Sequence, residues 1–172
     1  MNKDELLDFI EGNKFGLDDL LELSFHKDRQ VAFRSAWKLE YYMVNEPREF
    51  VERLPAFFKL FPGVENQSAM RHYTKIVALL TDRKANSLYK VVLSEFDFEP
   101  IIEKLFTWLV DDEVLVASKV HCMQSLANLS PRYDWIKDEL LQTINHLEQI
   151  ESIAFFARAK VVKKTLKKQS AK

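Results

Sequence analysis

The strongest constraint on the fold of this chain is an apolar stripe at helical spacing that occurs four times. Each stripe has apolar residues at offsets 0, 4, 7 and 11, which lie on one face of an α-helix, and an acidic residue four positions ahead. The residues are Asp28 with Ala32, Ala36, Leu39 and Met43; Glu65 with Ala69, Tyr73, Ile76 and Leu80; Asp112 with Val116, Val120, Met123 and Ala127; and Glu151 with Phe155, Ala159, Val162 and Leu166. The stripes start 37, 47 and 39 residues apart, at residues 32, 69, 116 and 155. Intervals of this length predict stacked helical hairpins.

A shorter apolar pattern precedes each stripe, and we interpret it as the other helix of the hairpin. The first pattern begins after Gly16, and the others begin at Pro47, Pro100 and Pro131, because proline favours the first turn of a helix. Their apolar residues are Leu17, Leu20, Leu21 and Phe25; Phe50, Leu54, Phe57 and Phe61; Ile101, Leu105 and Leu109; and Trp135, Leu140, Ile144 and Leu147. Pro55 lies inside the second of these helices and is expected to kink it.

The stripes predict one domain over residues 1–172, an all-α superhelix, or α-solenoid. A single hairpin cannot bury both of its apolar faces, so neighbouring hairpins have to stack. The four hairpins are expected near residues 16–44, 47–80, 98–129 and 131–168. Residues 82–98 form an irregular insert with a short helix, and a helix over residues 3–11 is expected to cap the N-terminal end.

Composition favours the same all-α class. The 172 residues are 47% hydrophobic and include 13 Phe, enough for a buried core, while 3 Gly and 5 Pro leave little turn chemistry for β-hairpins. No apolar run approaches the roughly 18 residues of a membrane-spanning helix. Cys122 is the only cysteine, which excludes an internal disulfide, and the N-terminal segment is acidic, unlike an export peptide. We therefore expect a protein of the reducing cytoplasm.

The first stripe helix resembles the second helix of a HEAT repeat, a member of the armadillo-type helical-repeat family. That helix has an acidic turn residue followed by Val, a small residue and Leu. The matching residues are Asp28, Val31, Ala36 and Leu39 in the first unit, and Glu151, Ala159 and Val162, the last in place of Leu, in the fourth. HEAT repeats usually carry a basic residue directly after the Val, where this chain has Ala32. The resemblance covers roughly residues 16–168 and implies about four stacked hairpins with a concave, partner-binding face.

Residues for catalysis or metal binding are few and scattered. The four histidines, which are His26, His72, His121 and His146, lie in different predicted helices without the His-x-x-x-His spacing that presents two ligands from one helix. Cys122 follows His121 directly, but neighbours on a helix point about 100° apart and are poorly placed for thiolate activation. The three glycines form no phosphate-binding loop. We expect no metal, no cofactor and no catalytic residue.

A mixed basic and aromatic set on the stripe helices is the best candidate for a binding surface. The set comprises Arg34, Trp37, Lys38, Tyr41 and Tyr42 on the first stripe helix, Arg71, His72 and Lys75 on the second, and Lys119 on the third. In a solenoid these residues would line the concave face, which predicts a non-catalytic scaffold that binds a protein or peptide. Alternatively, Trp37 and Tyr41 fill the core between hairpins and the basic residues are simply solvated.

The charge distribution leaves a second function open. Residues 95–113 hold seven acids and one base, whereas residues 158–172 hold seven bases and no acid. The basic segment, with Arg158, Lys160, Lys163, Lys164, Lys167 and Lys168, either stabilises and solubilises the last helix or binds nucleic acid. The second alternative would resemble the HEAT-like DNA alkylation-repair glycosylases. Overall charge opposes it, because the net charge is −1 and the pI is near 6.4.

Overall fold

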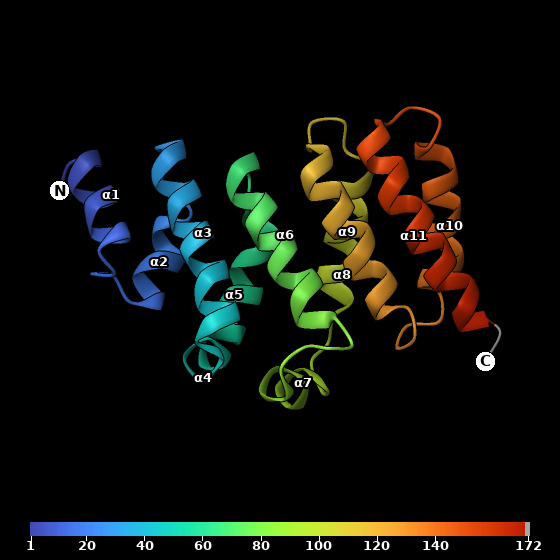
Figure 1. The fold of residues 1–172 in the computed structure, drawn as a ribbon, viewed down its shortest axis with the longest axis horizontal. Helices are drawn as coiled ribbons and strands as arrows, with labels where there is room; N and C mark the ends of the chain where they lie inside the picture. Colours follow the sequence, from blue (N-terminus) through green and yellow to red (C-terminus); the bar gives the residue numbers. More distant parts are fainter. Residues whose placement is uncertain (171–172) are drawn as a thin grey trace. The chain divides into compact units, whose positions relative to one another are not determined.

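The computed structural model describes residues 1–170, which form helices and connecting turns without any strand (Figure 1). The α-helices are α1 (Lys3–Glu11), α2 (Leu17–Leu23), α3 (Arg29–Asn45), α4 (Pro47–Phe50), α5 (Leu54–Leu60), α6 (Gln67–Thr81), α7 (Ser87–Leu93), α8 (Glu99–Val110), α9 (Val116–Leu129), α10 (Ile136–Leu147) and α11 (Ile153–Ser170). The predicted all-α class is confirmed. None of the described helices is both long and apolar enough to cross a bilayer. Lys172, the last base of the predicted basic segment, lies outside the described residues.

The chain forms two compact units, which we call the N-unit and the C-unit. The N-unit comprises Met1–Ile76 and Asn86–Phe96, and the C-unit comprises Val77–Ala85 and the chain from Asp97 onward. Their boundary falls within α6, so both units contain part of this helix. The single superhelical domain over residues 1–172 stays a prediction.

Side-chain caps explain where the long helices of the N-unit begin. The carboxylate of Asp28 accepts a hydrogen bond from the backbone N–H of Val31 at 3.1 Å and opens α3. That hydrogen bond is the largest of the effects that hold the pKa of Asp28 below its ordinary value. At α6 the amide oxygen of Asn66 accepts from the N–H of Ala69 at 2.9 Å. The cap of α6 is thus Asn66, one residue after the acid Glu65 that marks the second stripe.

An aromatic cluster fills the N-unit core. Its centre is Tyr73 of the second stripe, whose ring stacks on Phe57 with a centroid distance of 5.0 Å. The Tyr73 hydroxyl forms a 2.7 Å hydrogen bond with the Ser24 hydroxyl, and burial raises the pKa of Tyr73 to about 12. Phe25, which follows the end of α2, meets the Tyr73 ring edge to face. The whole first stripe is buried as predicted.

Pro55 divides the helix predicted to start at Pro47. The segment consists of α4, a 3-10 turn over Val51–Arg53, the helix α5 and a second 3-10 turn over Phe61–Gly63. Pro55 lies in the first turn of α5, where its missing N–H costs no helical hydrogen bond. The predicted interruption is confirmed, and the four apolar residues of this segment are all buried.

The insert after α6 contains the short helix α7, as predicted. The hydroxyl of Tyr89 on α7 donates a 2.6 Å hydrogen bond to the backbone carbonyl of Met43 near the end of α3. Asn86 caps the helix by accepting from the N–H of Leu88. The buried Tyr89 therefore fastens this part of the insert to the N-unit.

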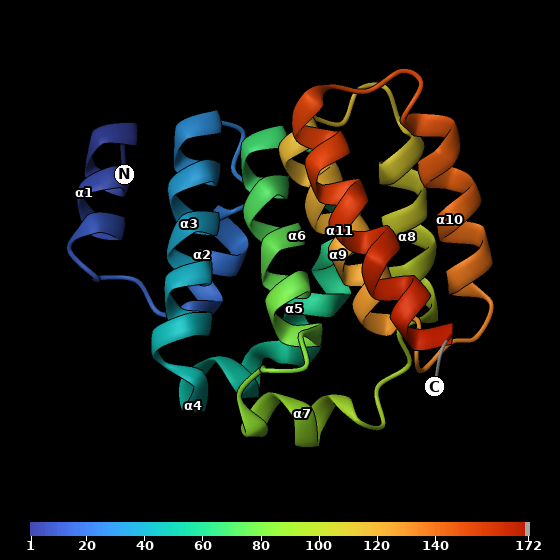
Figure 2. The ribbon, with the colours of Figure 1, turned by 45° about the vertical axis from the view of Figure 1, so that its right-hand side comes forward.

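The C-unit is built around α9, which contacts α8, α10 and α11 (Figure 2). The fourth stripe is buried along its whole length, so α11 has the predicted orientation. The apolar residues of α8, which are Ile101, Leu105 and Leu109, are buried as well. α11 is therefore held by one face against the core of the C-unit.

The third stripe differs from its prediction. Val116 and Val120 are only half-buried, whereas Lys119, Cys122 and Leu126 are buried. The acid-rich segment ahead of the helix forms a turn, and α9 has Leu115 at its N-cap, without a side-chain cap from Asp112. The predicted register is wrong for the first half of α9, because three neighbouring helices select a wider buried face than the apolar pattern indicates.

The start of α10 also differs from its prediction. Pro131 does not open the helix, because residues 131–135 form a turn and α10 begins at Ile136. Trp135 therefore lies outside the helix, is largely exposed, and stacks on Phe106 of α8 with a centroid distance of 5.8 Å. The predicted helix start is wrong by five residues.

Candidate functional site

The predicted basic and aromatic residues of α3 and α6 that belong to the N-unit form what we call the α3–α6 surface. It comprises Arg34, Trp37, Lys38, Tyr41, Arg71, His72 and Lys75, of which Lys38 and His72 are buried, contrary to the prediction that all of them face a partner. Trp37 and Tyr41 are 42% and 46% exposed, so these two rings do not fill the core. Tyr42 is half-buried beside Tyr41, with a centroid distance of 6.0 Å. Large rings exposed one helical turn apart are unusual on a helix whose other face is fully buried.

Lys38 lies between the two exposed rings. Its ammonium group is 5.8 Å from the ring centroid of Trp37 and 5.1 Å from that of Tyr41, within the range of cation–π attraction. Only 8% of Lys38 is exposed, so the rings and the neighbouring chain cover most of this residue. The exposed rings of Trp37 and Tyr41 on α3 therefore have an ammonium group next to them.

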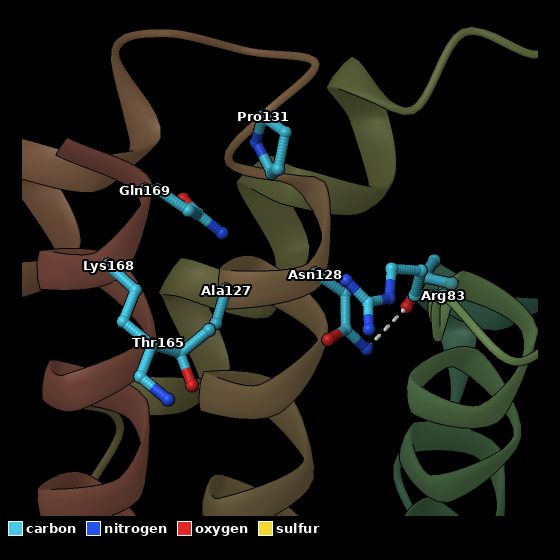
Figure 3. A pocket seen from close by; sticks show the side chains of 8 residues that line it. Arg83, Ala127, Asn128, Pro131, Thr165, Lys168 and Gln169 are labelled. Atoms are coloured by element: carbon cyan, nitrogen blue, oxygen red, sulfur yellow. Dashed lines mark hydrogen bonds between the residues drawn. The ribbon is translucent and has the colours of Figure 1, made fainter. Parts of the chain in front are cut away.

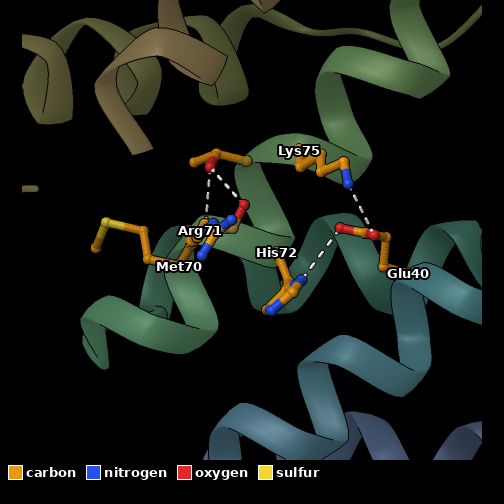
Figure 4. Close-up of polar contacts among 6 residues, drawn as sticks. Glu40, Met70, Arg71, His72 and Lys75 are labelled. Carbon is orange, nitrogen blue, oxygen red and sulfur yellow. Dashed lines mark hydrogen bonds and ion pairs between the residues drawn. The ribbon is translucent and has the colours of Figure 1, made fainter. Parts of the chain in front are cut away.

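Glu40 links the two helices of this surface (Figure 4). One carboxylate oxygen lies 3.1 Å from Nδ1 of His72, and the other accepts a 3.0 Å hydrogen bond from the ammonium of Lys75. Glu40 was not among the predicted site residues, although its separations of 32 and 35 residues from these partners are close to the 37 residues between the first two stripes. The opposite charges of Glu40 and Lys75, 35 residues apart, were the sequence signal from which this link could have been predicted.

The charge of Glu40 is set by two opposing effects. Partial burial of the carboxyl favours its neutral form, but the hydrogen bonds from His72 and Lys75 outweigh this and hold the pKa of Glu40 below its ordinary value. The carboxylate is therefore ionised at neutral pH and compensates Lys75. Nε2 of His72 is buried and has no hydrogen-bond partner among the residues that the structure describes.

Lys119, the third-helix member of the predicted set, lies in the C-unit and is buried. Its ammonium donates a 2.6 Å hydrogen bond to the carboxylate of Glu151, just ahead of α11, and only 3% of its side chain is exposed. Lys119 is therefore a structural ion-pair residue and does not present its charge to a partner. The signal for this role is again the separation of 32 residues between opposite charges.

The predicted basic segment lies on α11 in the C-unit. A hollow of about 500 Å³ is lined by Glu148 and Phe156 and by four lysines, which are Lys160, Lys163, Lys164 and Lys167. Lys163 donates a 2.8 Å hydrogen bond to Glu148. Arg158 is half-buried and donates a 3.0 Å hydrogen bond to Gln124 of α9. Lys160, Lys164 and Lys167 are thus exposed on one side of α11, Lys163 is half-buried there, and Arg158 serves the packing of α9 against α11.

A second hollow of the C-unit, of about 550 Å³, is bounded by the C-terminal parts of α6, α9 and α11 (Figure 3). Its lining includes Arg83 and Lys168, and the side chain of Asn128 spans from α9 to the backbone carbonyl of Ala78 at 3.0 Å. Gln169 accepts a 2.6 Å hydrogen bond from the hydroxyl of Ser130. Two further cationic side chains, Arg83 and Lys168, thus line this second hollow.

Neither the described residues of the α3–α6 surface nor those of the two hollows of the C-unit include a cluster of metal-binding or nucleophilic side chains. Among residues 1–170, no group of three or more His, Cys, Asp or Glu side chains could hold a metal ion. Cys122 is fully buried, and burial raises the pKa of its thiol above the ordinary value, which keeps it protonated.

No protein-family model, curated protein or solved structure matches this chain. Its function therefore has to be inferred from its own residues.

Proposed function

We propose that this chain is a non-catalytic scaffold of HEAT-like helical hairpins whose α3–α6 surface binds an acidic, partly apolar segment of a protein partner. The observation that carries the proposal is the exposure of Trp37 and Tyr41 on either side of the Lys38 ammonium. Tryptophan, tyrosine and cationic side chains dominate the energetics of protein interfaces, because they combine large apolar area with a polar group.

The charges of this surface favour an acidic partner. Glu40 compensates Lys75, but in the part of the chain that the structure describes no carboxylate forms an ion pair with Arg34, Lys38 or Arg71. Lys38 lies beside the exposed rings of Trp37 and Tyr41, so Asp or Glu next to a large apolar side chain complements both features.

Polar links between helices support the HEAT-like repeat as part of the proposal. Glu40 bonds to residues 32 and 35 positions later in the N-unit. In the C-unit, Lys119 and Gln124 bond to residues 32 and 34 positions later. Similar separations within each unit are what a repeated hairpin produces, because equivalent positions of neighbouring helices face one another.

The alternative is a nucleic-acid-binding protein that resembles the HEAT-like DNA alkylation-repair glycosylases. This function has less support, because the overall pI near 6.4 differs from the value above about 9 that is common for duplex-binding domains.

A peptide-display selection tests the proposal directly. The immobilised protein is expected to enrich peptides with Asp or Glu beside Leu, Phe or Trp, and fluorescence anisotropy then gives their dissociation constants. Trp37→Ala with Tyr41→Ala should weaken the enriched peptides at least tenfold, or about 1.4 kcal/mol. Val91→Ala with Val92→Ala, which removes exposed apolar side chains from α7 of the same unit, is the matched control and should change nothing.

Charge reversal separates the acidic partner from a purely apolar one. Arg34→Glu with Arg71→Glu should abolish binding of the acidic peptides while leaving the helical circular dichroism and the melting temperature unchanged, because both side chains reach solvent. Peptides that bind the Trp37 and Tyr41 variant as tightly as the wild type would contradict the proposed surface.

A further inference from the structure

The outer face of α11 carries a stripe of lysines that the packing of the helix does not require. Lys160, Lys163, Lys164 and Lys167 lie three and four residues apart, within an arc of about 100° that also contains Phe156. The fourth apolar stripe of α11 is fully buried against the C-unit core, and its centre lies about 120° around the helix from that of the lysines. The orientation of the helix is therefore settled by its apolar face, which leaves Lys160, Lys164 and Lys167 exposed and Lys163 half-buried.

The stability of α11 does not account for these lysines. Like charges three or four residues apart weaken a helix, and the stripe contains four such pairs. The helix macrodipole favours cations only in the last turn, whereas Lys160 stands ten residues before Ser170, about 15 Å from the end of the helix. Repulsion among these lysines therefore lowers the stability of the helix, and a bound anion would reduce that repulsion.

The stripe is largely without counter-charges. Glu148 pairs with Lys163, but among residues 1–170 no carboxylate pairs with Lys160, Lys164 or Lys167. The chain from Ser152 onward contains no acid at all. Three adjacent ammonium groups therefore keep their positive potential in and around the hollow of about 500 Å³.

Phe156 adds a flat apolar surface at one end of this stripe. Its ring is 39% exposed and lines the same hollow as the lysines. At the other end Lys168 continues the cationic face toward the second hollow, which Arg83 also lines (Figure 3). Lys160 and Lys168 are eight residues apart, or about 12 Å along the helix.

We propose that this face of α11 binds single-stranded nucleic acid, with the lysines on successive phosphates and a base stacked on Phe156. A cationic track with an aromatic ring is the usual means of holding a single strand without reading its sequence. This activity belongs to the C-unit and is independent of the peptide binding proposed for the α3–α6 surface.

Fluorescence anisotropy of a labelled oligothymidine of about twenty nucleotides, over a salt series, tests the proposal. The full-length chain should bind, and the logarithm of its binding constant should fall with the logarithm of salt concentration with a slope of about −0.7 for each phosphate neutralised. Lys160→Ala with Lys164→Ala should weaken binding at least tenfold at low salt and reduce the steepness of the slope by about 1.4. Lys27→Ala with Lys59→Ala, which removes two exposed lysines of the N-unit, is the control of equal charge and should change binding less than twofold.

Substitutions of Phe156 test the stacking. Phe156→Leu retains an apolar side chain but no ring face, and it should weaken binding at least fivefold without changing the salt slope, whereas Phe156→Trp should bind as well as the wild type. The proposal is overturned if the oligonucleotide fails to bind at low salt, or if both lysine pairs have the same effect. Equal binding to an acidic peptide of the same charge, or preferential binding to phosphatidylserine vesicles, would also overturn it. Peptide binding at the α3–α6 surface should persist in every one of these variants.

Discussion

The two units differ in how charge connects their neighbouring helices. In the N-unit the carboxylate of Glu40 on α3 holds His72 and Lys75 of α6, and the Lys75 side chain remains 43% exposed. In the C-unit the order of the charges along the chain is reversed, because Lys119 on α9 pairs with the later residue Glu151. Only 3% of the Lys119 side chain and 13% of the Glu151 side chain are exposed. The sequence separation is 32 residues for both Glu40–His72 and Lys119–Glu151.

Two polar links with the same sequence separation can therefore have different roles in the protein. The Glu40 side chain is only 14% exposed, but Lys75 is 43% exposed, so water competes for the ammonium and this pair contributes less to stability than a buried pair. A buried pair cannot lose one partner without leaving an uncompensated charge, so the Lys119 link sets how α9 and α11 pack. Exposure, not spacing, separates a link that shapes a binding surface from one that maintains the fold.

The largest effect should come from breaking the buried pair. Glu151→Ala leaves the Lys119 ammonium buried without its partner and should lower the free energy of unfolding by about 3–5 kcal/mol, measured by urea denaturation. The double variant Lys119→Met with Glu151→Leu removes both charges and should recover most of that loss. A loss below about 1 kcal/mol in Glu151→Ala would show that the two links do not differ as described.

A smaller, pH-dependent effect is expected from the N-unit link. Because the pKa of Glu40 is lowered from its ordinary value of 4.5 on folding, its ionised form stabilises the folded state above that value. This contribution is lost as the pH falls through the lowered pKa. Glu40→Gln should therefore cost about 1–2 kcal/mol near pH 7, and the difference from the wild type should shrink as the pH falls below about 4.5. A difference that stays constant down to about pH 3 would mean that the charge of Glu40 has no part in it.

The smallest effect concerns two serines, one in each unit. Ser35 of α3 and Ser118 of α9 are fully buried, and their hydroxyl groups have no hydrogen-bond partner in the described part of the chain. Ser35→Ala and Ser118→Ala should each raise the free energy of unfolding by about 0.5–1 kcal/mol, because alanine favours the helix and removes an unsatisfied polar group. Destabilisation by either variant would reveal a bound water at that hydroxyl, and unequal effects would distinguish the packing of the two units.

The helices were largely predictable because their signals are local. Asp28 is a helix cap by its own side chain, and Pro55 interrupts a helix through its own missing N–H, whatever surrounds them. The first and fourth stripes are buried as predicted, since each helix has one clearly apolar face. The candidate site was predictable only in part, because the residues of α3 were identified but Glu40, which connects them to α6, was not.

The sequence by itself determined the all-α class, the approximate positions of the helices and the apolar faces of α3 and α11. Only the tertiary structure decided that Lys119 is buried while Lys38 lies between two exposed rings. Both are lysines on stripe helices, and both were predicted to lie in the same binding surface. The physical reason is that the burial of a polar side chain depends on the rotation of its helix and on the partner that a neighbouring helix supplies, and Glu151 supplies that partner to Lys119 from 32 residues away.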